Sequence, residues 1–193
     1  MADQTVPERM NENDVVDLLL HQHDLIKELF AEVEGAPPDA RGEPFQRLVR
    51  LLAVHETAEE QIVHPYARRK LPGGEAVVDE RLAEENAAKD MLAEMEKAGV
   101  DDPQFTANLA TLRASVLEHA AAEEREEFPQ LRAETSEAER RTMAVGVKAA
   151  EALAPTHPHP GVETATENLL MGPLAAVKDR TVDAIRKAMG KQA

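Results

Sequence analysis

The sequence predicts an all-α protein: an antiparallel up-down-up-down four-helix bundle with additional C-terminal helices. Strong helix formers, above all Ala, Glu and Leu, are abundant in the 193 residues, and runs of alternating β-branched residues are absent. Apolar residues recur at helical spacing in four successive segments that are separated by short loops. Aromatic residues make up only 3% of the chain, so we expect an aliphatic core.

The first helix is predicted over about residues 14–34, with a cap at Asn13–Asp14. Its apolar face contains His23, which follows Val16 by seven residues and precedes Phe30 by seven. A single inward histidine is more often a hydrogen-bonded core residue than a metal ligand. The other inward polar residues of this chain favour the ligand role for His23.

Two further segments carry the same motif, His-x-x-x-Glu-Glu, followed by three residues, then His or Phe, then Pro. Residues four apart lie on one face of a helix, and in both segments the His and the first Glu continue an apolar stripe. The bland alternative is a chance pairing on two surface helices, which the repetition of the motif argues against. The second helix is predicted over about 43–67 with His55 and Glu59, and the fourth over about 103–132 with His119 and Glu123.

The third helix, predicted over about residues 75–98, has a glutamate at the centre of its apolar face. Glu85 follows Val78 by seven residues and precedes Leu92 by seven. A carboxylate at this place needs a charged partner or a metal ion. The alternative is an error of one residue in the register, which would place Asn86 nearer the core.

Burying imidazoles and carboxylates is costly unless something charged satisfies them. Nitrogen and oxygen ligands in this mixture suit iron, manganese or zinc, and the number of ligands suits two ions with positions open for a small ligand. The single-zinc protease motif is excluded, because His55 is followed by Glu59 where that motif needs a second histidine. The candidate metal ligands are His23, His55, Glu59, Glu85, His119 and Glu123.

Residues 14–132 resemble the hemerythrin-like domain of the HHE cation-binding type. The resemblance rests on Leu-Leu-Leu-His-Gln-His-Asp around His23, on the two His-x-x-x-Glu-Glu motifs, and on Ala-Glu-Glu-Asn-Ala-Ala-Lys at 83–89. It implies two non-heme iron ions with an oxo or hydroxo bridge inside the bundle. It also implies that Glu59 and Glu123 are the bridging carboxylates.

The sequence departs from the family pattern at two places. Glu85 stands where the family usually has His, and an anionic oxygen donor there should favour the ferric state and weaken reversible O2 binding. His64 stands where the family often has Tyr. Its role is open between a metal ligand, a proton donor and a core histidine, and Tyr66 is a candidate for a supporting contact.

The resemblance implies a di-iron protein that handles a small ligand such as O2, peroxide or nitric oxide. Such a protein could be a catalase- or peroxidase-like enzyme in oxidative stress defence, or a sensor. A non-catalytic iron-binding or O2-binding module is the first alternative. A metal-free helical interaction protein, with its polar core groups hydrogen-bonded to each other, is the second. The sequence does not decide between turnover and binding alone.

Residues 133–193 are predicted to form a C-terminal helical extension of the bundle at 14–132, without a metal role. Ser136 and Glu139 form a capping box that opens a fifth helix ending at about Leu153. His157 and His159 lie among prolines and are interpreted as loop residues. A last helix is predicted over about 173–189.

The formal net charge of −15 argues against nucleic-acid binding, which needs clustered Lys and Arg. The absence of cysteine excludes disulfides, iron–sulfur clusters and thiol catalysis. No apolar run approaches the length of a membrane span, so no membrane partner is expected. We expect a cytoplasmic monomer or homodimer whose partner is a diatomic molecule or peroxide.

Overall fold

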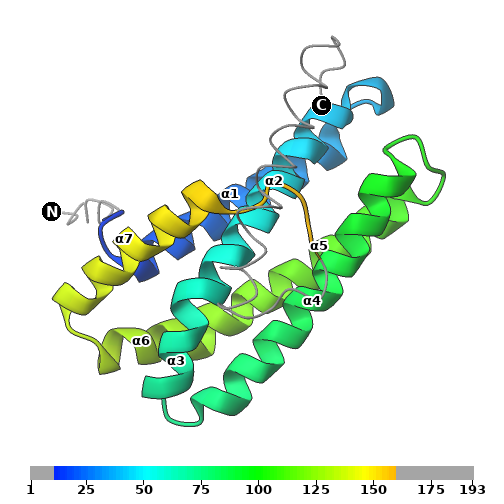
Figure 1. The fold of residues 1–193 in the computed structure, drawn as a ribbon. Coiled ribbons are helices and arrows are strands. Elements are labelled where there is room, and N and C mark those ends of the chain that lie inside the picture. The colour runs from blue at the N-terminus through cyan, green and yellow to red at the C-terminus, as the bar shows by residue number, and fades with distance from the viewer. Residues whose placement is uncertain (1–10, 160–193) are drawn as a thin grey trace, which may run out of the picture.

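The computed structural model describes residues 11–159, which contain four long helical rods and one further helix joined by loops. Figure 1 shows their arrangement. Two of the rods each consist of an α-helix, a π-helical segment and a second α-helix without a break. A 3-10 turn, η1 (Pro38–Ala40), lies between the first two rods. The rods are α1 (Val15–Gly35); α2, η2 and α3 (Gly42–Ala58, Glu59–Val63, His64–Lys70); α4 (Gly74–Ala98); and α5, η3 and α6 (Phe105–Ala122, Glu123–Glu127, Phe128–Glu134).

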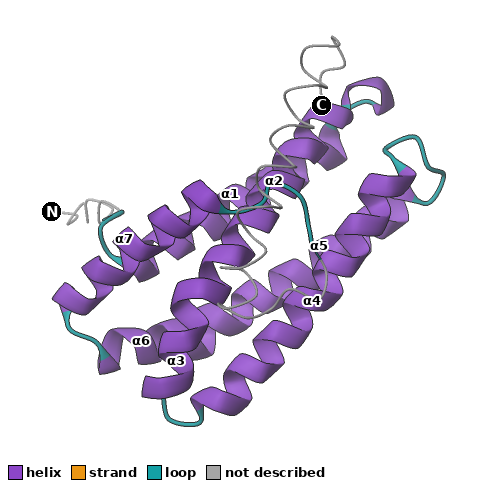
Figure 2. Ribbon diagram, in the orientation of Figure 1, coloured by secondary structure: helices purple, strands orange, loops and turns teal. Residues whose placement is uncertain are grey.

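The rods form a closed ring of neighbours. Helix α1 packs against α2 and α5, and α4 packs against α3 and α5, so each rod has two neighbours in the bundle. All regular elements among residues 11–159 are helical (Figure 2). The prediction of an all-α four-helix bundle is therefore confirmed, and the observed helix ends lie within a few residues of the predicted ones.

Local capping explains where several helices begin. The side chain of Asp14 accepts a hydrogen bond of 3.0 Å from the Val16 backbone N–H at the start of α1. The predicted capping box of Ser136 and Glu139 is present at the start of α7 (Glu137–Leu153). Gly99, which follows α4, has a φ of +85°, a conformation that an L side chain rarely adopts.

A π-helical segment directly precedes the residue before each proline of the repeated motif. In η2 the His64 backbone N–H donates to Glu59 O, and in η3 the Phe128 N–H donates to Glu123 O, five residues back in each case. The second rod continues past Pro65 to Lys70, close to the predicted end at about residue 67. A proline has no N–H and its ring crowds the carbonyl four residues back, and the wider π turn accommodates it.

The hydrophobic core consists of two clusters with a polar layer between them. One cluster includes Val15, Leu19, Val63 and Leu131, and the other includes Ile26, Phe30, Phe45, Leu48, Leu92 and Leu112. Along α1, His23 lies between Leu19 of the first cluster and Ile26 of the second. The six candidate ligands thus occupy a layer in the middle of the bundle, closed at both ends by apolar side chains.

Helix α7 packs against α1, α2 and η2 on the outside of the bundle (Figure 1). Its buried residues Met143, Ala144, Val147 and Ala150 belong to the same cluster as Val15. His157 follows the helix and pairs with Glu96 of α4 at 2.8 Å. The predicted helix at 173–189 lies outside the described residues. None of the described helices is long and apolar enough to cross a membrane.

Candidate metal centre

The structure brings all six candidate ligands together in the polar layer. Glu59 and Glu123 are fully buried, and His23 is 1% exposed. One group of ligand atoms comes from His23, His55 and Glu59, and a second comes from Glu59, Glu85, His119 and Glu123. The atoms of each group lie within 4.8 Å of one another. Glu59 belongs to both groups, which is the placement expected of a carboxylate that serves two ions.

The three predicted histidine ligands are oriented in the same way. The Nε2 atoms face inward: that of His55 lies 3.3 Å from Glu59 Oε2, and that of His23 lies 3.3 Å from Glu123 Oε2. His119 Nε2 lies 3.6 Å from Glu123 Oε2 and 3.7 Å from Glu85 Oε1. All three imidazoles therefore present the same ring nitrogen to the centre of the layer.

The Nδ1 atoms of these histidines face outward, each towards an acceptor beside the layer. These contacts are His23 Nδ1 to Glu124 Oε1 at 2.9 Å, His55 Nδ1 to Gln22 Oε1 at 2.7 Å, and His119 Nδ1 to Glu84 Oε2 at 2.9 Å. An ionised carboxylate or an amide oxygen can only accept, so Nδ1 carries the proton and the Nε2 lone pair of a neutral ring points inward. Metal-binding histidines are usually held in this way.

The imidazoles and carboxylates of the layer shift one another's pKa values. Burial opposes the charged form of His119, but Glu123 and Glu84 raise its pKa to about 9. Burial and the neighbouring Glu123 raise the pKa of Glu59 well above its usual range. Burial opposes ionisation of Glu123 as well, but His119 and His23 lower its pKa to about 2. Burial, together with the neighbouring His23, lowers the pKa of His55 to about 3, so its ring is neutral. A bound cation would stabilise every ionised carboxylate of the layer.

Several buried polar atoms in the layer have no hydrogen-bond partner among the described residues. The absence of partners is costly for groups with almost no exposure to water, and a metal ion would satisfy it. The residues present therefore fit a metal centre. The atoms are His23 Nε2, His119 Nε2, Glu85 Oε2, and both carboxylate oxygens of Glu59 and of Glu123.

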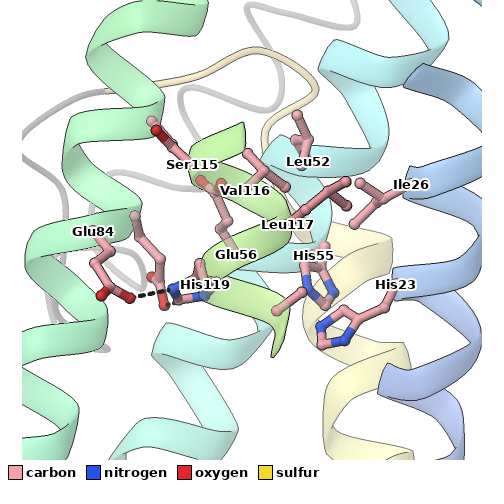
Figure 3. A pocket seen from close by; sticks show the side chains of 13 residues that line it. His23, Ile26, Leu52, His55, Glu56, Glu84, Ser115, Val116, Leu117 and His119 are labelled. Atoms are coloured by element: carbon pink, nitrogen blue, oxygen red, sulfur yellow. Dashed lines mark hydrogen bonds and ion pairs between the residues drawn. The ribbon is translucent and has the colours of Figure 1, made fainter. Parts of the chain in front are cut away.

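A small cavity adjoins the layer on the side of the second hydrophobic cluster (Figure 3). Its volume is about 20 Å³, which is enough for about one water-sized molecule. Ile26, Leu52 and Val116 form its apolar wall, and His23, His55 and His119 border it on the polar side. The Glu56 carboxyl also lines the cavity, and burial raises its pKa to about 8.

His64 and Glu127 are buried in the layer but are not among the six predicted ligands. His64 lies 2.5 Å from Glu85 Oε1 through its Nε2, and Glu127 is fully buried beside it. Glu127 follows Glu123 by four residues, so the spacing rule could have found it. The hydroxyl of Tyr66, in contrast, donates to Glu139 of α7 at 3.0 Å, a contact with α7 and not with the layer.

Comparison with known proteins identifies the family of this chain. The family model of the hemerythrin HHE cation binding domain matches residues 14–131, more than half of the chain. The chain belongs to the hemerythrin HHE cation-binding family. The crystal structure of an HHE cation-binding domain-containing protein from Mycobacterium kansasii superposes with a TM-score of 0.64 at 19% identity, over 86% of this chain and 98% of that one. This similarity supports the fold.

A curated relative, named DNA nickase, comes from Nostoc sp. (strain PCC 7120 / SAG 25.82 / UTEX 2576). It is 26% identical to this HHE protein over 138 residues, which cover 71% of this chain. The match spans only 39% of the relative's length.

Gln22 links the centre to α7, which leads to a first prediction. Its Oε1 accepts from His55 Nδ1, and its Nε2 donates to Glu151 Oε1 at 2.5 Å. Gln22→Leu removes the acceptor that orients His55, so we expect the affinity for the metal ion at the position of His23 and His55 to fall about 10- to 100-fold. A titration of the metal-free protein in competition with a chelator measures this. Gln46→Leu, a half-buried residue away from the layer, is the control, and equal affinities in both variants would refute the orienting role.

Proposed function

We propose that this protein holds two non-heme iron ions in the polar layer and handles a small ligand such as O2, peroxide or nitric oxide. The observation that supports this most strongly is the set of inward Nε2 atoms and carboxylate oxygens that lack hydrogen-bond partners in the core. The adjoining cavity of about 20 Å³ borders His23, His55 and His119, and its small size supports a small ligand.

The two ligand groups suggest how the residues divide between the ions. Glu59 and Glu123 would serve both ions: Glu59 belongs to both groups, and Glu123 Oε2 lies near both His23 and His119. His23 and His55 would complete one position. Glu85 and His119 would complete the other.

Iron bound in this layer would supply one-electron redox chemistry and a Lewis-acidic position for the small ligand. The protein's residues have separate tasks. Gln22, Glu84 and Glu124 hold the imidazole rings with Nε2 inward. Ile26 and Leu52 in the cavity wall keep bulk water away from the polar layer.

The experiment that tests the proposal combines metal analysis of the purified protein with its optical spectrum. We expect about two iron ions per chain and near-ultraviolet absorption from the bridged pair. Oxygen evolution on addition of peroxide would favour a catalase-like enzyme. Full iron content without oxygen evolution would favour the alternative, a non-catalytic iron-binding, O2-binding or sensing module. Absence of bound metal would refute both.

Glu85 allows a second prediction, about redox preference. Its carboxylate is an anionic donor at a place where the family pattern has a neutral imidazole, and it should stabilise the ferric state. We expect Glu85→His to slow reoxidation of the reduced protein in air several-fold, followed by absorbance after rapid mixing. Glu80→His, at an exposed position of the same helix, is the control. Identical rates in Glu85→His and the parent protein would show that Glu85 does not set the redox preference.

The nicking activity in the name of the Nostoc relative is not part of this proposal. The net charge of −15 opposes contact with a phosphate backbone, and the match covers 39% of that relative's length.

A further inference from the structure

A fourth imidazole, that of His64, lies in the same polar layer as the three predicted histidine ligands. It is 2% exposed and begins α3, directly after the first π-helical segment. We propose that His64 binds metal through Nε2 at the position of Glu85 and His119, and that Glu127 orients its ring. This inference rests on the proposed function, because it extends the same metal centre.

The π-helical turn is what directs His64 into the layer. In a regular α-helix, the fifth residue after Glu59 points roughly 140° away from it around the helix axis. Here the His64 backbone N–H donates to Glu59 O, five residues back, and the wider turn spreads more residues over one revolution. His64 therefore returns to the face that carries Glu59. Insertions of this kind are frequent at functional sites.

Both ring nitrogens of His64 face carboxylates, with Nε2 hydrogen-bonded and Nδ1 without a hydrogen-bond partner among the described residues. Its Nε2 faces an inner carboxylate, Glu85 Oε1, at 2.5 Å, and its Nδ1 faces Glu127 Oε1 at 3.9 Å. Glu127 is fully buried, and neither of its carboxylate oxygens has a hydrogen-bond partner among the described residues. A ring bound to metal through Nε2 carries its proton on Nδ1 and would present it to Glu127.

In the second copy of the motif, the residue that corresponds to His64 is Phe128, which has no nitrogen donor. Phe128 follows the second π-helical segment just as His64 follows the first, and its N–H makes the equivalent bond to Glu123 O. The Phe128 ring stacks on His23 with centroids 5.5 Å apart and an interplanar angle of 20°. The two halves of the centre thus differ: one has a hydrocarbon ring at this place, and the other has an imidazole beside two carboxylates.

The alternative is that His64 is a core histidine that only pairs with Glu85 and Glu127. The number of imidazoles bound to metal separates the two cases. X-ray absorption spectroscopy of the wild-type full chain loaded with two equivalents of cobalt(II) should show four imidazoles per two ions. Three imidazoles per two ions would overturn the inference and leave the proposed function standing. A wild-type chain that takes up no metal would overturn both.

Variants provide a second test with a substitution that the chain itself suggests. His64→Phe copies Phe128 and should preserve the fold. We expect one of the two equivalents of cobalt(II) to bind at least about tenfold more weakly than in the wild-type protein, and the other to bind unchanged. His21→Phe, which removes a half-exposed histidine of α1, is the control. Two equivalents bound by His64→Phe with wild-type affinity would overturn the inference.

The role of Glu127 is tested by a pair of substitutions. Glu127→Leu cannot accept from the His64 ring and should weaken the binding of one of the two cobalt(II) equivalents about tenfold. Glu127→Gln keeps an acceptor oxygen and should remain close to the wild-type protein. Equal affinities for Glu127→Leu and the wild-type protein would overturn the orienting role.

Discussion

Replacing Glu59 or Glu123 by alanine is expected to remove both metal ions together, from about two ions per chain to nearly none. The reason is the place of these carboxylates between the two groups of ligand atoms. Glu59 belongs to both groups, and Glu123 Oε2 lies 3.3 Å from His23 Nε2 and 3.6 Å from His119 Nε2. Loss of a ligand that serves one ion would weaken the binding of that ion alone, but loss of a shared ligand weakens the binding of both ions. Metal analysis after dialysis at equal protein concentration measures the effect.

A control and a stability measurement make this result interpretable. Glu118→Ala removes an exposed carboxylate on α5, the helix that ends at Ala122, and should leave the iron content unchanged. The metal-free Glu59→Ala protein should be at least as stable as the metal-free parent, because burial and the neighbouring Glu123 penalise the Glu59 charge. Retention of both ions in Glu59→Ala and in Glu123→Ala would refute the shared role.

The six candidate ligands could be predicted from the sequence because each interrupts an apolar stripe of known period. His23 and Glu85 are each seven residues from apolar neighbours on either side, and the His-x-x-x-Glu pairs have the spacing of one helical turn. The structure places all six in one layer. The register that puts Glu85, and not Asn86, in the core was the correct one: Glu85 is 2% exposed and Asn86 is half-buried.

The inward placement of His64 could not be predicted in the same way, because the π-helical turn changes the period over a few residues. A constant 100° per residue turns His64 away from Glu59 and brings Tyr66 back towards it. The structure shows the reverse: His64 is in the layer, and Tyr66 contacts Glu139 of α7. The proline after His64 was the available signal, since a proline disfavours the regular i to i−4 bond of the α-helix.

The outer partners of the imidazoles depend on how neighbouring helices are rotated, which one sequence does not reveal. His55 of α2 is hydrogen-bonded to Gln22 of α1, and His119 of α5 is hydrogen-bonded to Glu84 of α4. The sequence predicts no metal role for residues 133–193. Glu151 of α7 nevertheless accepts a hydrogen bond from Gln22, which in turn contacts His55. Helix α7 therefore supports the centre indirectly, through Gln22.

Introducing a carboxylate at Val147 of α7 is expected to destabilise the protein strongly. Val147 is fully buried in the cluster that also contains Val15 and Val63, and α7 packs there against α1, α2 and η2. Val147→Asp would bury a carboxylate in an apolar cluster, which should lower the free energy of unfolding by about 3 kcal/mol or more. For a domain of this size, that corresponds to a fall in Tm of roughly 10 °C. Thermal unfolding followed by circular dichroism measures it.

The same helix provides a matched control two residues away. Val145 is 69% exposed, so Val145→Asp makes the same chemical change in water and should shift the free energy of unfolding by about 0.5 kcal/mol or less. Both variants should be compared in the metal-free state, because bound iron would add its own stabilisation to the folded form. A large fall in Tm for Val147→Asp alone would show that the bundle depends on α7 as a fifth core helix. Equal Tm values for the two variants would instead mean that α7 does not dock on α1 and α2 in solution. The Gln22–Glu151 contact would then be lost as well.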